Sequence, residues 1–212
     1  MTDLDLHLNK LIIALDGINL DQRIFIVEQY RDKVAAFKVN HASYTFMSAY
    51  TNKLMYDFKL SDIPNTNETV IEHILKTDAS LVTVMMNNSE SAYAKLAPLA
   101  DRIRLVGVTA LTSMSEAEYM DIYGRSLEEA YERSIRLMEK YKFFGAVCAP
   151  TDLKYFKGSS LKTLCPGIRL EGDDLGDQVR TMTPTEAIKA GADYIIMGRS
   201  FINRITFKGV DA

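Results

Sequence analysis

A lysine with an acidic residue on each side stands in the segment Asp57-Phe58-Lys59-Leu60-Ser61-Asp62. Nearby negative charge stabilises the ammonium form of a lysine side chain and keeps it protonated. A lysine that forms a Schiff base needs the opposite surroundings, in which burial or another cation lowers its pKa. Lys59 is therefore expected to be a general acid, which donates a proton to a reacting group.

Two more charged residues, Asp16 and Lys38, stand at or near the ends of the two preceding apolar segments. Alternate residues of a strand share a face, so Asp57 and Lys59 point to the same side of theirs. Any one of these four could be a solvated charge at a strand end or part of a structural ion-pair network. Burying unpaired charge is costly, however, so four charges on three adjacent strands favour a functional site.

A second candidate cluster lies near the other end of the sequence. Gly198-Arg199-Ser200 follows an apolar strand-like segment and opens the last helix, where backbone N–H groups and a guanidinium could bind phosphate. The segment 166–178 is long and glycine-rich, and it supplies Arg169 and Gln178. Its length predicts a mobile lid over this phosphate site.

The elements that must position these residues are eight short apolar runs separated by longer helical stretches, such as Leu20–Tyr30 and Leu127–Tyr141. This alternation predicts parallel strands joined by crossover helices. The eight expected strands are Lys10–Asp16, Ala35–Asn40, Leu54–Leu60, Leu81–Met86, Leu105–Leu111, Ala146–Pro150, Thr163–Ile168 and Tyr194–Gly198. Eight such units in 212 residues predict a compact (β/α)8 TIM barrel.

An open doubly wound α/β sheet is the structural alternative. Such a sheet usually carries a glycine-rich turn after its first strand. The corresponding turn here contains the single glycine Gly17 and no G-x-G-x-x-G pattern. The barrel is therefore favoured.

Composition limits the class of protein. A chain of 212 residues that is 47% hydrophobic, with no low-complexity linker, is expected to form one domain, 1–212. The net charge of −3 comes from interspersed acidic and basic residues, which predicts no nucleic-acid or membrane partner. Cys148 and Cys165 lie in apolar runs and are expected to be reduced thiols of a cytoplasmic protein. The three histidines lack metal-ligand spacing, so no metal site is expected.

The motifs together resemble the orotidine 5′-monophosphate decarboxylase family. The pattern Asp57-x-Lys59-x-x-Asp62-Ile63-Pro64-Asn65-Thr66 is similar to the signature of that family. Pro166-Gly167-Ile168-Arg169, Gln178 and Gly198-Arg199-Ser200 resemble its phosphate-binding elements. The resemblance extends from Leu11 to about Phe201, and it implies a TIM barrel that decarboxylates orotidine monophosphate without a cofactor.

Roles for individual residues follow from the resemblance alone. It implies that Asp16 and Lys38 hold the ribose hydroxyls, that Lys59 protonates C6 of the pyrimidine, and that Asp57 lies against the departing carboxylate. The catalytic set is then Lys59, Asp57, Asp62 and Lys38. The further substrate contacts that it implies are Ile63, Thr66, Thr112, Arg169, Gln178, Gly198 and Arg199, with Ser113 as an alternative to Thr112.

The resemblance also implies a homodimer, because Asp62, with Thr66 nearby, would reach into the site of the neighbouring subunit. One departure from the family concerns the sequence after Ser200, which predicts a short or incomplete final helix. We expect this to leave apolar surface uncovered and to weaken the support of Arg199.

Two other functions remain open from the sequence. Relatives in the same superfamily, a 3-keto-L-gulonate 6-phosphate decarboxylase and a hexulose-phosphate synthase, use magnesium to act on a sugar enediolate. The carboxylates of this chain could serve such a metal. A barrel that binds phosphate without catalysis is the second alternative.

Overall fold

The computed structural model describes residues 4–44, 47–77, 79–173 and 181–207. Its centre is a closed barrel of eight parallel strands in sequential order, in which β1 pairs with both β2 and β8. The TIM-barrel prediction is confirmed, and each of the eight expected runs overlaps a strand. The strands are β1 (Leu11–Ala14), β2 (Ala36–Val39), β3 (Leu54–Leu60), β4 (Ala79–Met85), β5 (Arg104–Val108), β6 (Gly145–Val147), β7 (Lys162–Cys165) and β8 (Tyr194–Met197).

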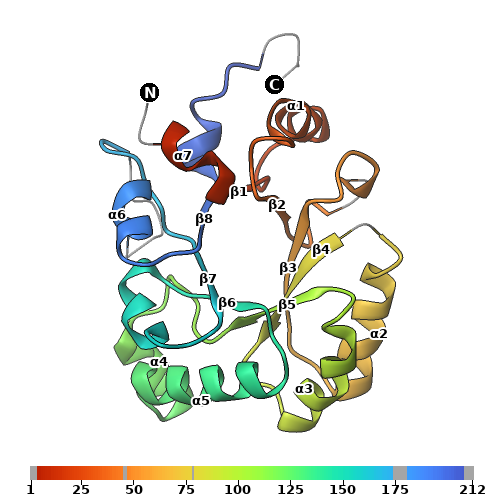
Figure 1. Cartoon of the computed structure of the whole chain (residues 1–212), viewed down its shortest axis with the longest axis vertical. Coiled ribbons are helices and arrows are strands. Elements are labelled where there is room, and N and C mark those ends of the chain that lie inside the picture. The colour runs from red at the N-terminus through yellow and green to blue at the C-terminus, as the bar shows by residue number, and fades with distance from the viewer. Residues whose placement is uncertain (1–3, 45–46, 78, 174–180, 208–212) are drawn as a thin grey trace.

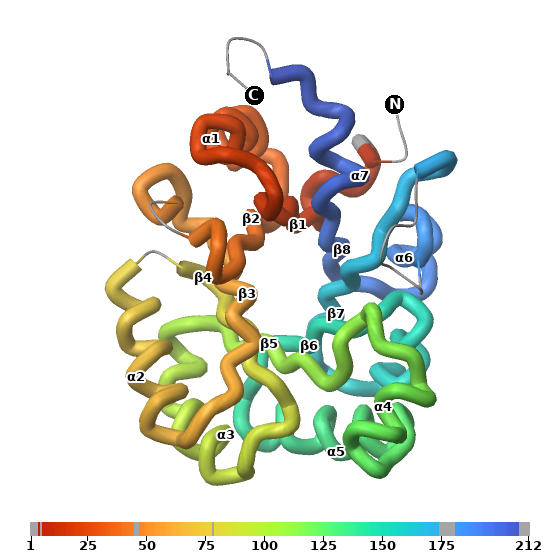
Figure 2. Tube along the Cα trace, turned by 180° about the vertical axis from the view of Figure 1, so that it is seen from behind, coloured from red at the N-terminus to blue at the C-terminus, as the bar shows by residue number. Residues whose placement is uncertain are grey.

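Helices surround the strands, as Figures 1 and 2 show from opposite sides. The α-helices are α1 (Leu20–Tyr30), α2 (Pro64–Ile74), α3 (Glu90–Leu96), α4 (Glu116–Tyr123), α5 (Leu127–Lys140), α6 (Pro184–Lys189) and α7 (Arg199–Ile202). The 3-10 helices are η1 (Asp5–Lys10), η2 (Met47–Ala49), η3 (Ala97–Leu99) and η4 (Pro150–Phe156). In the described part of the chain, the 3-10 helix η2 is the only helix between β2 and β3, and η4 is the only helix between β6 and β7. Regular α-helices were expected at both places.

Capping boxes fix the start of several helices. The Asn19 side chain accepts a hydrogen bond from the backbone of Gln22, whose side chain accepts one from the backbone of Asn19, so α1 begins at Leu20. The same reciprocal pair starts α5 between Ser126 and Glu129. Both helices begin where the periodicity of the sequence predicts.

Two apolar cores lie on the two sides of the barrel wall. The interior core is formed by side chains at alternate strand positions, such as Ile12, Ala36 and Met55, while a larger core lies between the strands and the helices. Lys38 and Asp57 stand two residues beyond Ala36 and Met55. The period of two therefore carries these charges to the carboxyl end of the barrel, on its inner side.

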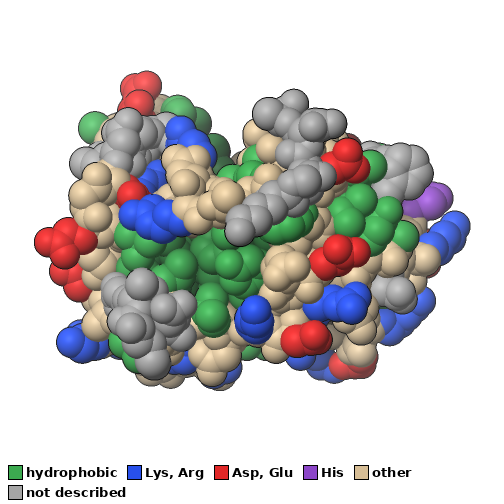
Figure 3. Space-filling model, turned by 90° about the horizontal axis from the view of Figure 1, so that it is seen from above, with side chains coloured by type: hydrophobic (Ala, Val, Ile, Leu, Met, Phe, Trp, Pro, Cys, Tyr) green, Lys and Arg blue, Asp and Glu red, His purple; other side chains and the backbone are tan. Residues whose placement is uncertain are grey.

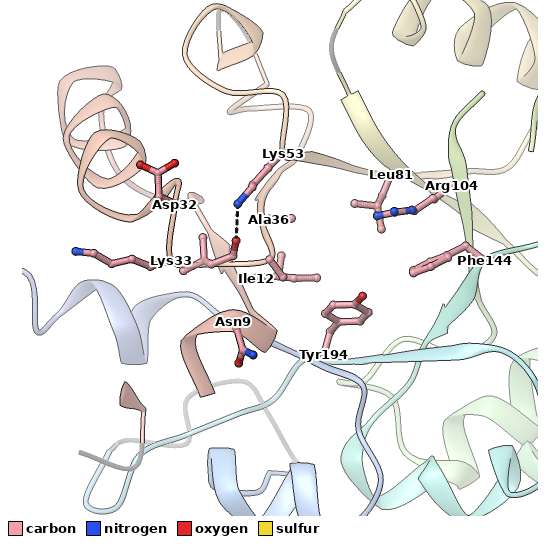
Figure 4. Close-up of a pocket in the computed structure, with 12 residues that line it drawn as sticks. Asn9, Ile12, Asp32, Lys33, Ala36, Lys53, Leu81, Arg104, Phe144 and Tyr194 are labelled. Carbon is pink, nitrogen blue, oxygen red and sulfur yellow. Dashed lines mark hydrogen bonds between the residues drawn. The ribbon is translucent and has the colours of Figure 1, made fainter. Parts of the chain in front are cut away.

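The amino end of the barrel has a cavity of about 360 Å³ (Figure 4). Lys53 lines it and donates hydrogen bonds to the carbonyls of Arg31 and Val34, at 2.7 and 3.1 Å. Arg104 lies over the ring of Phe144, with 4.9 Å between the guanidinium carbon and the ring centroid. These groups brace the end of the TIM barrel whose residues ordinarily serve stability.

Helix α7 has only four residues, in agreement with the prediction of a short final helix. The expected loss of apolar cover is offset in part, because Phe201 is buried and Phe207 packs edge-on against Phe25 of α1, with 5.6 Å between ring centroids. Viewed from above, an apolar area is flanked by interspersed acidic and basic side chains (Figure 3). Within the described ranges, no helix is long and apolar enough to cross a membrane.

The two cysteines are neighbours in space, one directly after β6 and the other at the end of β7. Cys148 and Cys165 are fully buried thiols with 3.8 Å between their Sγ atoms, and no disulfide joins them. The expectation of buried thiols is confirmed for this structure.

Candidate active site

Strands β1, β2 and β3 bring together Asp16, Lys38, Asp57 and Lys59, which we call the charge cluster. The Lys38 ammonium lies 2.7 Å from Asp16 Oδ2 and 3.2 Å from Asp57 Oδ2. Lys59 Nζ lies 2.9 Å from Asp57 Oδ1. Cations and anions therefore alternate along one row, and the cluster as a whole is electrically neutral.

The backbone of β3 is irregular where it carries the cluster. Tyr56 pairs with Val82 but Leu60 pairs with Val84, so four steps along β3 match two steps along β4. Lys59, inside this bulge, has φ of +49°, a left-handed conformation that costs energy for a residue with a side chain. A bulge of this kind redirects side chains at a functional site.

Thr83 of β4 holds the bulge in place. Its hydroxyl accepts a hydrogen bond from the Lys59 backbone N–H at 2.8 Å and donates one to Asp57 Oδ1 at 3.0 Å. The side chain is fully buried. Sequence reasoning missed this residue, and the available signal was a hydroxyl in the apolar run Leu81–Met86, two positions after Leu81.

Burial and ion pairing have opposite effects on the two most enclosed charges of the cluster. Burial by itself raises the pKa of Asp57, but Lys38 and Lys59 outweigh it and bring the pKa below its ordinary value. Burial lowers the pKa of Lys38, and Asp57 and Asp16 outweigh it and raise the pKa. Both groups are therefore charged at neutral pH.

Two cavities adjoin the cluster. One, of about 240 Å³, is lined by Lys38, Asp57 and Lys59 from β2 and β3 and by Thr112 and Ser113, which follow β5. Both hydroxyl residues of the expected pyrimidine contact thus face the same space. Its remaining lining is largely apolar.

The other cavity, of about 460 Å³, is lined by Asp16 and Gly17 from the end of β1 and by Gly198 and Arg199 from the end of β8. The Asp16–Lys38 ion pair links it to the first cavity. Asp16, which the Ser43 hydroxyl also contacts at 3.3 Å, stands between the two. The structure thus joins the charge cluster and the expected phosphate residues at one end of the barrel.

Some expected residues lie apart from the cluster. Asp62 is exposed, and its Oδ1 accepts the backbone N–H of Ile63 at 2.7 Å. Within this chain Lys59 is therefore paired with Asp57 and not with Asp62, contrary to the flanking argument from the sequence. Ile63 is 66% exposed and Thr66 is exposed as well. These three residues stand on the surface at the start of α2.

The expected contacts after β7 are described only in part. Arg169 Nη1 donates to the carbonyl of Ile168 at 3.0 Å, and Arg169 lines neither cavity of the site. Gln178, and the part of the expected lid from 174 to 178, lie outside the described residues. Among the residues that the structure describes, no group of three or more His, Cys, Asp and Glu could hold a metal ion.

A closed parallel barrel with charged side chains where its strands end is the architecture of TIM-barrel enzymes. The family model described as "Orotidine 5'-phosphate decarboxylase / HUMPS family" matches residues 9–204. The chain therefore belongs to the orotidine 5′-phosphate decarboxylase / HUMPS family.

Curated relatives agree with this assignment. A Glaesserella parasuis protein named orotidine 5′-phosphate decarboxylase is 32% identical to this chain, over 90% of each chain. The relative in Shigella dysenteriae is also 32% identical, over 96% of this chain and 92% of the relative. The chain thus spans nearly the whole length of these proteins.

Solved structures share the fold. The orotidine 5′-phosphate decarboxylase of Lactobacillus acidophilus aligns with a TM-score of 0.72 and 21% identity, over 92% of both chains. An inhibitor complex of the Methanocaldococcus jannaschii enzyme aligns with a TM-score of 0.71 and 23% identity, over 93% of this chain and 92% of that one. At this identity the likeness supports the barrel alone.

Proposed function

We propose that this chain is a single catalytic domain that decarboxylates orotidine 5′-monophosphate to uridine 5′-monophosphate without a cofactor. The observation that carries the proposal is the charge cluster, a neutral row of alternating carboxylates and ammonium groups beside a cavity of about 240 Å³. Family membership and the names of the curated relatives support the same reaction.

The proposed chemistry needs one cation and one carboxylate at the reacting carbon. The bond between C6 of the pyrimidine and its carboxyl group breaks, CO₂ leaves, and the electron pair remains on C6. The Lys59 ammonium stabilises that carbanion and then transfers a proton to it. Asp57 lies against the departing carboxylate and remains ionised, because its ion pairs lower its pKa.

The rest of the nucleotide would occupy the neighbouring cavity. Asp16 and Lys38 would bind the ribose hydroxyls between the two cavities. Gly198 and Arg199 line the second cavity and would bind the phosphate, assisted by Arg169 and by Gln178. Binding of the remote phosphate would supply energy that assembles the reacting end of the site.

We propose further that the active unit is a homodimer in which Asp62, Ile63 and Thr66 contact the neighbouring site. Their exposure supports this proposal, since none of the three joins the cluster of its own chain. An apolar cavity of about 420 Å³, lined in part by Val70 of the same helix α2, has aromatic side chains in its wall that include Tyr44 and Phe58. A second copy of the chain would cover these rings, and Tyr44 is 45% exposed here.

The test is the ultraviolet absorbance change on adding orotidine monophosphate, comparing wild type with Lys59→Ala. We expect turnover by the wild type and a loss of at least about a thousandfold in the variant, because the proton donor and its charge both disappear. Uridine monophosphate should still bind to both proteins. Equal inertness of two proteins that bind uridine monophosphate would overturn the assignment.

The family description also includes HUMPS proteins, so magnesium-dependent sugar-phosphate chemistry is the second candidate. The position of Lys38 argues against it, because its ammonium stands between Asp16 and Asp57, where a metal bridging those carboxylates would have to lie. Turnover of orotidine monophosphate that survives EDTA would eliminate this candidate. Strict dependence on magnesium, with no turnover of orotidine monophosphate, would eliminate the first.

A further inference from the structure

The loop after β7 and helix α7 are joined by hydrogen bonds among Asp173, Ser200 and Arg204, which we call the β7–α7 latch. Arg204 Nη2 donates to Asp173 Oδ1 at 2.7 Å, and Arg204 Nη1 donates to the Ser200 carbonyl at 2.6 Å. The Ser200 hydroxyl donates to the Asp173 carboxylate. One guanidinium thus binds both elements at once.

The latch extends to the backbone of Leu170. Its N–H donates to Ser200 Oγ and to Asp173 Oδ2, at 3.2 Å in each case. Leu170 directly follows Arg169, and Ser200 directly follows Arg199. The link between Leu170 and Ser200 therefore fixes the spacing of the two backbone segments that carry these arginines.

Helix α7 needs such a link because of its length. A helix of four residues is not stable by itself, since a single turn does not repay the cost of ordering its backbone. Phe201 and Ile202 are buried and anchor one side of the turn. The other side is held by Arg204 and Asp173, whose pKa is lowered chiefly by the hydrogen bond from Arg204.

We propose that Asp173 and Arg204 are positioning residues, which hold Arg169 and Arg199 in the arrangement that binds the nucleotide phosphate. The inference rests on the proposed function in naming these two arginines as phosphate ligands. The latch residues would act on the phosphate only through the segments that they join. Their ion pair is partly exposed, with side-chain exposures of 43% for Arg204 and 17% for Asp173, so its effect on global stability should be small.

The experiment measures dissociation constants of uridine 5′-monophosphate and of uridine by calorimetry, in wild type, Arg204→Met and Asp173→Asn. We expect each variant to bind the nucleotide about tenfold more weakly, a change of about 1.4 kcal/mol. Uridine, which lacks the phosphate, should bind all three proteins alike. The control is Lys140→Met, which breaks the exposed ion pair of Lys140 with Glu90 between α5 and α3 and should change neither affinity.

Unchanged nucleotide affinity in the variants would overturn the proposal, and so would an equal loss for nucleotide and nucleoside. If Arg204→Met fails to fold, Asp173→Asn decides the matter, because it keeps the size of the side chain. A wild type that binds uridine monophosphate without decarboxylating orotidine monophosphate would refute the proposed function and leave this inference standing. A wild type that does not bind uridine monophosphate would overturn both.

Discussion

Replacing Thr83 by valine should weaken both the barrel and its chemistry. The two side chains have nearly the same shape, so the substitution removes a hydroxyl without opening a cavity. Two hydrogen bonds disappear, one from the hydroxyl to Asp57 Oδ1 at 3.0 Å and one from the Lys59 backbone at 2.8 Å. The left-handed backbone of Lys59 then loses its tie to β4.

The expected loss in the free energy of unfolding follows from these two hydrogen bonds. A hydrogen bond to a charged group contributes about 1.5–3 kcal/mol, and an unpaired buried N–H costs about 1–3 kcal/mol. The hydrogen bond of the Lys59 backbone N–H is only partly buried, so water can satisfy part of the second loss. We expect a total of about 2–4 kcal/mol. For a domain of this size, that lowers the midpoint of thermal unfolding by roughly 5–15 °C.

Thr109→Val is the matched control. Thr109 is 3% exposed, and its hydroxyl has no hydrogen-bond partner among the described residues. Removing it should be neutral or slightly stabilising. The assay is urea unfolding of both variants, with kcat measured alongside, and kcat should fall about a hundredfold in Thr83→Val if Lys59 shifts by about 1 Å. Thr83→Val within about 0.5 kcal/mol of the control would refute the reasoning.

Two further predictions concern the charge cluster and the dimer. The lowered pKa of Asp57 adds stability that is lost on acidification below about pH 4, and the raised pKa of Lys38 adds stability that is lost above about pH 10. In Asp57→Asn, Lys38 keeps one carboxylate, so its folded-state pKa falls back toward its ordinary value and the alkaline loss of stability in urea unfolding should become smaller or vanish. An alkaline loss of unchanged size would contradict the ion-pair argument. Mixing the inactive variants Lys59→Ala and Asp62→Ala should restore about a quarter of wild-type turnover. Half of the random dimers contain one chain of each variant, and in such a dimer one of the two sites has both an intact Lys59 and an intact Asp62. No recovery after refolding the mixture would exclude a shared site.

The strand pattern of the sequence was sufficient to predict the barrel and to group the four residues of the charge cluster. A period of two assigns each residue to a face, and parallel strands end at one edge, so Asp16, Lys38, Asp57 and Lys59 could be grouped without coordinates. The glycine and arginine at 198–199 followed from the same reasoning. The structure brings both groups to one end of the barrel.

Periodicity could not predict the bulge in β3, because register is decided by contacts between strands. Two extra residues of β3 relative to β4 turn the Lys59 backbone and create the role of Thr83. Sequence order sets Asp62 three residues after Lys59, but within one chain its carboxylate accepts the backbone N–H of Ile63, and its contact with the neighbouring subunit stays a prediction. Short 3-10 connections after β2 and β6 follow from packing, which local helical propensity does not determine.

The two lysines of the charge cluster differ in exposure and in the number of carboxylates that they contact. Lys38, 12% exposed, is held by two carboxylates. Among the described residues, Lys59, 39% exposed, has an ion pair with Asp57 alone, and it borders the smaller cavity. Asp57 receives both lysines and the Thr83 hydroxyl, so its carboxylate is fixed in orientation and held ionised. A carboxylate fixed in this way can stand beside a substrate carboxylate without taking up a proton. In the proposed decarboxylation, the less enclosed lysine is the one suited to follow the charge that would develop at C6, and the buried lysine would keep the row of charges in place.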